Sequence, residues 1–363
     1  MKIIILYASC GAGHRRAAEA AYGYIKEKYP AFDLQLIDAL QKTSPLFSNI
    51  YSYGYLFLVN YGRWLWYFLF KLTSFKYIKT LLNIPFILIS RISSGKLRRL
   101  LTDENPEVII STHFLPSDIA GRLKMSGRIS SKVINVVTDF GVHPLWICKG
   151  TDIYVAASAP SREQLIMRGV AADKIRDYGI PIDTKFSREY DRGQLNRKLG
   201  LEQGRFTVLI ATGSFGIGRI EEITGLLYKD TQVLVVAARN KRLYSRLKEK
   251  GYTGVKVYGF AENMHELMAA SDIIITKPGG MTIAESLSMG LVPIFITAVP
   301  GQETENARIL SENSIGLTIS RPSLVRDAVI GFKDDPARME KMRSRINEMR
   351  RPFAAKELCG VIC

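Results

Sequence analysis

Short apolar runs alternate with helical stretches along the whole of this 363-residue chain. In the first half, the runs predicted to form buried strands are 2–9, 34–40, 108–111, 132–138 and 153–156. In the second half, they are 206–211, 232–238, 254–258, 272–276 and 291–296. Apolar runs of this length, separated by helices, are typical of parallel sheets with helices on both faces. The pattern therefore predicts an α/β protein with two Rossmann-like sheets.

A polar, charged stretch at 183–204 interrupts this alternation. A chain of this length also exceeds what one hydrophobic core usually organises. We therefore expect a Rossmann-like domain over 1–182, a linker over 183–204 and a second Rossmann-like domain over 205–340. The remaining residues, 341–363, are predicted to form a helical tail that either caps the second domain or crosses back to the first.

The turn with the most chemical content follows the strand at 272–276 and reads KPGGMTIAE. It leads into a helix predicted at 281–289. The N-terminus of a helix offers unpaired N–H groups and a positive partial charge, which suits phosphate groups. Glu285, one turn further on, is placed to accept hydrogen bonds from a ribose. The residues predicted to line this phosphate site are Gly279, Gly280, Met281 and Thr282.

Other polar groups are predicted at the same sheet edge. The glycines alone fit an ordinary strand-turn-helix, but Gln302, Glu303 and Asn306 open a further helix after the next strand. Ligands of doubly wound sheets bind at this edge, so the second cluster favours a sugar-nucleotide site. A second glycine loop, at 211–218, lacks the Lys-Ser/Thr end of a P-loop, which argues against hydrolysis of a nucleoside triphosphate. The remaining candidates for the sugar-nucleotide site are Gly213, Ser214, Phe215, Arg239, Asn240 and Phe260, the last of which fits a buried core position equally well.

In the first half, Gly13 and His14 follow the first strand and open a helix. A histidine near a helix N-terminus is held neutral, and a neutral imidazole is suited to act as a general base. The alternative is a capping or surface histidine. Asp139 ends the strand at 132–138, where it either orients a histidine or binds an acceptor hydroxyl. The glycine spacing lacks the third glycine of a dinucleotide fingerprint, so an NAD site is disfavoured.

The loop after Asp139 contains His143, Pro144 and Trp146. Trp146 is predicted either to pack on an apolar acceptor or to lie in the core.

The net charge of +16 implies an anionic partner, either nucleic acid or an acidic membrane. No Asp or Glu occurs over 39–102, where many aromatic residues and basic residues lie. An aromatic core would not explain the missing acids, and we place an anionic phospholipid surface above nucleic acid. The apolar run at 81–90 is shorter than the ~20 residues of a membrane span. The insertion is placed at 43–101, and its marker residues are Arg63, Trp64, Trp66 and Lys71.

The four cysteines lack metal-type pairing, which fits a reducing cytosol. The N-terminal apolar run leads straight into glycines and is predicted to be a strand rather than a secretory signal. We therefore expect a peripheral protein at the cytoplasmic face of a membrane.

Several motifs occur together in one order: GAGHRRAAEA at 11–20, HPLW at 143–146, TKPGGMTIAE at 276–285 and GQE at 301–303. This set resembles the monogalactosyldiacylglycerol synthases and the bacterial processive diacylglycerol glucosyltransferases over nearly the whole chain. The resemblance implies a GT-B fold, with two Rossmann-like domains facing each other across a cleft. It also implies an inverting reaction without a bound metal or cofactor. One departure is Ala12, where the family usually has glycine.

By this resemblance, the chain transfers a hexose from a UDP-hexose to diacylglycerol, making a β-glycosyl glycolipid. His14, or else Asp139, would be the base, and Gln302 and Glu303 would bind the sugar hydroxyls. Three rival functions stay open. They are an N-acetylglucosaminyltransferase acting on a polyprenyl-linked peptidoglycan precursor, a sugar-nucleotide epimerase, and a non-catalytic UDP-sugar binder docked on a membrane.

Overall fold

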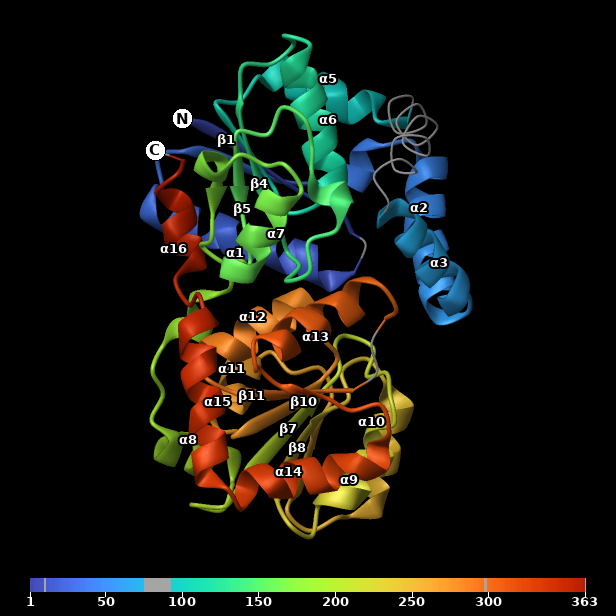
Figure 1. Cartoon of the computed structure of the whole chain (residues 1–363), viewed down its shortest axis with the longest axis vertical. Helices are drawn as coiled ribbons and strands as arrows, with labels where there is room; N and C mark the ends of the chain where they lie inside the picture. Colours follow the sequence, from blue (N-terminus) through green and yellow to red (C-terminus); the bar gives the residue numbers. More distant parts are fainter. Residues whose placement is uncertain (10, 75–92, 297–298, 363) are drawn as a thin grey trace. The chain divides into compact units, whose positions relative to one another are not determined.

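The computed structural model describes residues 1–9, 11–74, 93–296 and 299–362, and it divides into two compact units (Figure 1). The first unit comprises Met1–Thr184, Val299–Asn306 and Phe353–Cys363. The second unit comprises Lys185–Ala298 and Ala307–Pro352. Each unit is built around one parallel sheet.

The sheet of the first unit has the order β2-β1-β3-β4-β5-β6, and its paired strands are parallel. Its strands are β1 (Lys2–Tyr7), β2 (Asp33–Asp38), β3 (Val108–Ser111), β4 (Lys132–Val136), β5 (Ile153–Val155) and β6 (Ile175–Arg176). Its helices are α1 (Ala12–Lys28), α2 (Pro45–Asn60), α3 (Arg63–Ser74), α5 (Gly95–Glu104), α6 (Phe114–Met125), α7 (Ala159–Met167) and α16 (Ala354–Cys359).

The sheet of the second unit has the order β12-β11-β10-β7-β8-β9, again with parallel pairs. Its strands are β7 (Thr207–Ala211), β8 (Gln232–Val236), β9 (Val255–Tyr258), β10 (Ile273–Thr276), β11 (Val292–Phe295) and β12 (Leu317–Thr318). Its helices are α8 (Arg192–Leu199), α9 (Ile220–Leu227), α10 (Lys241–Lys250), α11 (Met264–Ala269), α12 (Gly280–Ser288), α14 (Val325–Lys333) and α15 (Pro336–Met349). Helix α13 (Gln302–Glu312) begins in the first unit and ends in the second.

The predicted α/β class is confirmed, and each of the ten predicted strands forms within or close to its expected range. The edge strands β6 and β12 were not predicted, because two residues are too few to show a periodicity. The stretch 183–204, predicted as a linker, contains α8, and the boundary between the units falls after Thr184.

Strand β1 shows why the central strands are apolar throughout. Its successive side chains point to opposite faces of the sheet. Ile4 and Leu6 join the core under α5 and α6, while Ile3 and Ile5 join the core under α1. Both faces of the strand are therefore buried, and a continuous apolar run replaces the alternation seen in half-exposed strands.

The end of the chain completes the second of these cores. The helical tail breaks around Pro352, after which α16 packs against α1 (Figure 1). Leu358, Val361 and Ile362 are buried among the side chains of β1 and α1. The last residues therefore belong to the first unit, although α15 belongs to the second.

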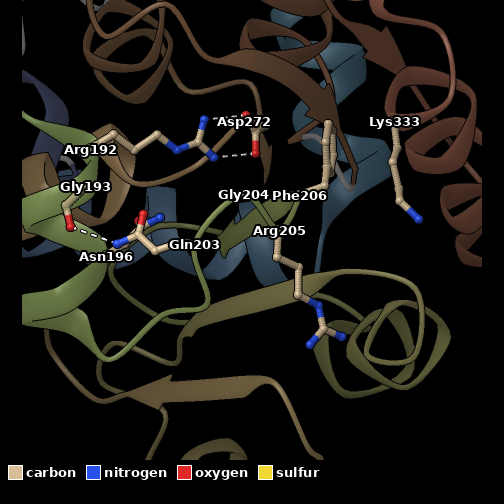
Figure 2. Close-up of a pocket in the computed structure, with 9 residues that line it drawn as sticks. All are labelled: Arg192, Gly193, Asn196, Gln203, Gly204, Arg205, Phe206, Asp272 and Lys333. Carbon is tan, nitrogen blue, oxygen red and sulfur yellow. Dashed lines mark hydrogen bonds and ion pairs between the residues drawn. The ribbon is translucent and has the colours of Figure 1, made fainter.

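A buried carboxylate fastens α8 to the sheet of the second unit. Nη1 and Nη2 of Arg192 donate to the two carboxylate oxygens of Asp272, at 2.7 and 2.6 Å (Figure 2). The backbone N–H of Thr207 donates to the same carboxylate at 2.9 Å, and Asp272 is only 8% exposed. Arg192 and Asp272 line a cavity of about 510 Å³ at the amino ends of β7 and β10, and none of the predicted site residues lines it.

We expect Arg192→Ala to lower the free energy of unfolding of the second unit by about 2 kcal/mol. The change leaves a buried carboxylate without its main partner, a loss that partial exposure of Arg192 reduces. All three tryptophans lie in the first unit. A urea transition seen by far-ultraviolet circular dichroism, but not by tryptophan fluorescence, therefore reports on the second unit.

Arg345→Ala is the matched control, because the ion pair of Arg345 with Glu348 is exposed on both sides. Its effect should stay within about 0.5 kcal/mol. Equal effects of the two substitutions would show that the Arg192–Asp272 pair contributes nothing special to stability.

Candidate active site and donor-binding loops

Each sheet has one topological switch point, where neighbouring strands lead into connections that diverge. In the first unit it lies between β1 and β3, and in the second it lies between β7 and β10. Ligands of doubly wound sheets bind at the carboxyl ends of strands at such points. The predicted site residues follow these strands or their neighbours, so the topology of each unit brings them together.

His14 is the third residue of α1, directly after Gly13, and it lies at the switch point of the first unit. Its ring nitrogen Nδ1 lies 2.9 Å from the carbonyl oxygen of Thr112, which follows β3. The same nitrogen lies 2.8 Å from Oγ1 of Thr138, which follows β4. The hydroxyl of Thr112 in turn donates to the carbonyl of His14 at 2.8 Å. Two strand ends therefore hold the imidazole while the residue stays partly exposed.

Removal from water lowers the pKa of His14 below its ordinary value of 6.5. The negative charge of Asp139 and the carbonyl of Thr112 act in the opposite direction but do not cancel this effect. The direction is the one expected from the sequence, although burial rather than the helix terminus is the largest cause. The imidazole is therefore neutral near pH 7, the state in which it accepts a proton.

A second histidine lies edge-on to the first. The ring of His113 is 4.6 Å from that of His14, and its Nδ1 accepts a hydrogen bond from the backbone N–H of Leu115 at 3.1 Å. His113 therefore caps the N-terminus of α6. Burial, and then the charge of His14, hold the pKa of His113 well below its usual value.

Asp139 is 4% exposed and surrounded by neutral donors. Its carboxylate accepts from Nε2 of Gln302 at 2.7 and 2.8 Å and from Nε1 of Trp146 at 3.1 Å. Burial raises the pKa of Asp139, whereas the charge of His14 and these hydrogen bonds lower it. The effect of Asp139 on His14 is electrostatic.

The first two turns of α13 are bound to the loop after β4 within the first unit. Oδ1 of Asn306 accepts from the backbone N–H groups of Phe140 and Gly141, each at 2.9 Å. Gln302, expected from the resemblance to bind a sugar, uses its amide nitrogen on Asp139. Glu303, for which the same was expected, accepts the N–H of Val299 at 2.8 Å.

The HPLW segment forms a short 3₁₀ turn, Pro144–Trp146, capped by His143. Nδ1 of His143 accepts from Leu145 at 3.2 Å, and its Nε2 lies 3.3 Å from the carbonyl oxygen of Phe70. Trp146 is 2% exposed and packs in a core cluster, so the structure favours the core alternative for its side chain.

Helices α2 and α3, together with Tyr61 between them, carry eight large exposed apolar side chains among the described residues of the first unit. These are Leu46, Ile50, Tyr53, Phe57, Tyr61, Trp64, Tyr67 and Phe68. Trp64 is 76% exposed, whereas Trp66 is partly buried. Nζ of Lys71 lies 5.6 Å from the ring centre of Tyr67. Residues 75–92 of the predicted insertion and the Arg63 side chain lie outside the described part. Within that part, no helix combines the length and apolar character needed to cross a bilayer.

The glycine loop after β7 is held by the loop that follows β8 in the second unit. Nδ2 of Asn240 donates to the carbonyl of Gly216 at 3.2 Å, and the backbone N–H of Arg239 donates to that of Ser214 at 3.3 Å. Gly213 has a φ of +84°, which favours glycine. Phe215 in this loop and Phe260 after β9 are both exposed, so Phe260 is not a core residue here.

The second predicted donor-binding element is the start of α12, after the neighbouring strand β10. Thr276 Oγ1 donates to the carbonyl of Ala211 at 2.6 Å and so ties the end of β10 to that of β7. Gly279 caps α12 without a side-chain hydrogen bond, so no side chain of the capping residue covers the first N–H groups. Within this helix, Gly280, Met281 and Glu285 are buried, and Thr282 is partly exposed.

Lys277 was not among the predicted site residues, yet it joins these two elements. A Cβ atom on Gly213 would lie 2.9 Å from Cε of Lys277 and 4.0 Å from its Nζ. The lysine stem therefore occupies the space that the glycine leaves, and it brings an ammonium group to the glycine loop. Its position directly before Pro-Gly-Gly was the available signal, but only the β7–β10 pairing shows which loop it meets.

The departure at Ala12 leaves the turn before α1 intact. Ala12 is the first residue of the helix and has no positive φ, whereas the residue that does need one, at +91°, is Gly11.

Two family models match the chain in succession. The model for monogalactosyldiacylglycerol (MGDG) synthase matches residues 14–182, and the model for the glycosyltransferase family 28 C-terminal domain matches residues 207–352. The processive diacylglycerol beta-glucosyltransferase of Bacillus cereus strain AH187 is 29% identical over 367 residues. The match covers 99% of this chain and 93% of that protein.

Solved structures show the same fold at low identity. Acinetobacter baumannii MurG superposes with a TM-score of 0.63 at 12% identity, covering 99% of both chains. The UDP-GlcNAc 2-epimerase from Neisseria meningitidis, bound to UDP-GlcNAc, gives 0.62 at 14%, covering 100% of this chain and 99% of the other. These likenesses confirm the GT-B class. Because a UDP-GlcNAc 2-epimerase shares this fold, the fold alone does not establish which reaction the chain performs.

Proposed function

The chain belongs to the monogalactosyldiacylglycerol synthases and family 28 glycosyltransferases, and on this basis we propose that it transfers a hexose from a UDP-sugar to diacylglycerol. The product would be a β-glycosyl glycolipid, formed with inversion. The observation that carries the proposal is the position of His14. A neutral, partly exposed histidine lies at the switch point of the unit that matches the MGDG synthases.

In the proposed reaction, His14 removes the proton from the free hydroxyl of diacylglycerol. The oxygen attacks the anomeric carbon as the bond from that carbon to the β-phosphate oxygen breaks. UDP leaves with the electron pair of this bond, and the proton stays on His14. In-line attack from the side opposite to UDP accounts for the inversion.

Asp139 contributes by its charge in this scheme. The base becomes an imidazolium during the reaction, and a nearby carboxylate stabilises that cation. Because Gln302 and Trp146 hold both oxygens of Asp139, the charge is kept in one place. We therefore assign the base role to His14 rather than to Asp139.

The donor half of the proposal rests on the second unit. The start of α12, where the capping residue Gly279 has no side chain, the glycine loop and Lys277 provide N–H groups and a positive charge for the diphosphate. Glu285 is proposed for the ribose and Glu303 for the sugar. Gln302 would meet the sugar through its amide oxygen, because its nitrogen is bound to Asp139.

We also propose a peripheral location at the cytoplasmic face of a membrane, because the proposed acceptor is a membrane lipid. The exposed aromatic side chains of α2 and α3 lie in a segment without acidic residues. Such a surface suits the interface of an anionic phospholipid bilayer.

The test is to incubate the purified protein with anionic liposomes that contain diacylglycerol, to add UDP-glucose or UDP-galactose, and to analyse the lipids by mass spectrometry. We expect a hexose increment on diacylglycerol with one of the two donors, and co-flotation of the protein with the liposomes. Liposomes without diacylglycerol are the control. UDP-sugar binding without glycolipid would refute the acceptor assignment, and polyprenyl-linked acceptors would be tested next.

A further inference from the structure

One nitrogen of His14 has two oxygen neighbours at hydrogen-bond distance. Nδ1 lies 2.9 Å from the carbonyl oxygen of Thr112 and 2.8 Å from the hydroxyl oxygen of Thr138. Thr112 and Thr138 are both buried. The two oxygens come from the ends of the neighbouring strands β3 and β4.

These two neighbours differ in what they can do. A hydroxyl either donates or accepts, whereas a carbonyl oxygen only accepts. A bare Nδ1 lone pair at 2.9 Å from the carbonyl of Thr112 would be repelled by it. The carbonyl of Thr112 therefore requires a proton on Nδ1. The resulting N–H donates to this carbonyl and also to the hydroxyl oxygen of Thr138. In the neutral ring, the lone pair is then on Nε2.

We propose that Thr138 is a positioning residue, which together with the Thr112 carbonyl holds His14 in the Nδ1–H tautomer and leaves Nε2 as the basic atom. This inference rests on the proposed function for its meaning in catalysis. The tautomer itself follows from the three residues alone. An unconstrained histidine side chain prefers the Nε2–H tautomer. The tautomer proposed for His14 is therefore the opposite of the one expected for a free histidine.

The two oxygen neighbours of Nδ1 also affect the pKa of His14. An N–H of an imidazolium is a stronger donor than that of a neutral imidazole, so both acceptors favour the protonated ring. They therefore offset part of the opposing effect of burial. Among the described residues, the titratable groups that face the ring are Asp139, which favours protonation, and His113, whose own ring is held neutral.

The direct experiment is nitrogen NMR of the imidazole rings in protein labelled with ¹⁵N-histidine. The chain contains four histidines, and loss of one signal set in His14→Gln assigns the resonances of His14. We expect a protonated Nδ1 and an unprotonated Nε2 above pH 7. An Nε2–H tautomer in the unmodified protein would overturn the proposal.

Thr138→Val tests the contribution of the hydroxyl, and Thr138→Ser is the matched variant that restores it. We expect Thr138→Val to lower the pKa of His14 by roughly half to one unit, as for loss of one charge-assisted hydrogen bond. The acid limb of the plot of kcat against pH should move to lower pH by the same amount. The plateau of kcat should fall about fivefold, because a weaker base removes the proton of the acceptor hydroxyl less readily. Thr138→Ser should recover both.

A structural role alone would lower the melting temperature without moving the pKa, so an unmoved pKa in folded Thr138→Val contradicts the proposal. The NMR readout needs no turnover. If the tautomer is as stated but no glycolipid forms, the proposed function fails and the positioning role of Thr138 stands. If glycolipid forms but His14 is in the Nε2–H tautomer, the proposed function stands and the positioning role of Thr138 fails.

Discussion

His14→Ala is expected to lower kcat for glycolipid formation by about a thousandfold, within the range that general-base catalysis supplies. The Kd for UDP should change by no more than about twofold, because the proposed donor-binding elements follow β7 and β10 while His14 lies on α1. Mass-spectrometric initial rates measure the first quantity, and isothermal titration calorimetry with UDP measures the second. For the unmodified protein, the acid limb of the kcat profile should lie below pH 6.5, since burial lowers the pKa of His14.

His265→Ala is the matched control, because His265 lies on α11 in the second unit, where it contacts the rings of Phe186 and Tyr190. Its turnover should remain close to that of the unmodified protein. If His14→Ala weakened UDP binding as much as it lowered turnover, the assignment of His14 as the base would have to be withdrawn.

Lys277→Ala is expected to weaken UDP binding by about thirtyfold and to lower kcat as well. The stem of Lys277 packs against Gly213, which brings its ammonium group to the glycine loop. A charge-assisted contact of this kind contributes about 2 kcal/mol to binding. The leaving diphosphate gains negative charge as the glycosidic bond breaks, so the same ammonium also favours the transition state. Calorimetry with UDP and initial rates at saturating donor separate the two effects.

Lys277→Arg keeps the charge and should recover part of the affinity, with the remaining loss due to the larger guanidinium beside Gly213. Lys250→Ala removes an equal charge from the last turn of α10 and should leave the Kd unchanged. Equal UDP affinities for the unmodified protein and Lys277→Ala would exclude a diphosphate contact by this residue.

The local elements could be predicted from the sequence because each depends on neighbouring residues. The run at 108–111 coincides with β3, and the helix expected at 281–289 is α12, one residue earlier. Gly13 and His14 open α1 because glycines allow the turn that precedes it. Ten strand positions and the class of fold followed from such patterns, since a strand buried on both faces is apolar throughout.

The partners of the functional side chains were not predictable, because they depend on which strands are neighbours. The sequence runs from β1 to β2, yet β3 pairs with the other side of β1. That pairing sets the carbonyl of Thr112 beside His14, although 98 positions separate them in the chain. The contact of Lys277 with Gly213 was not predictable for the same reason, because it depends on the pairing of β10 with β7.

The amino-acid sequence alone thus determined the two parallel sheets, the glycine turns and the kinds of side chain at the strand ends. The tertiary structure decided that Gln302 binds Asp139, that Trp146 is buried, and that two threonines hold His14. The physical reason is the range of the interactions. Periodicity and turn chemistry act over a few residues, whereas burial and the hydrogen bonds of a buried polar group are settled only when distant segments pack together.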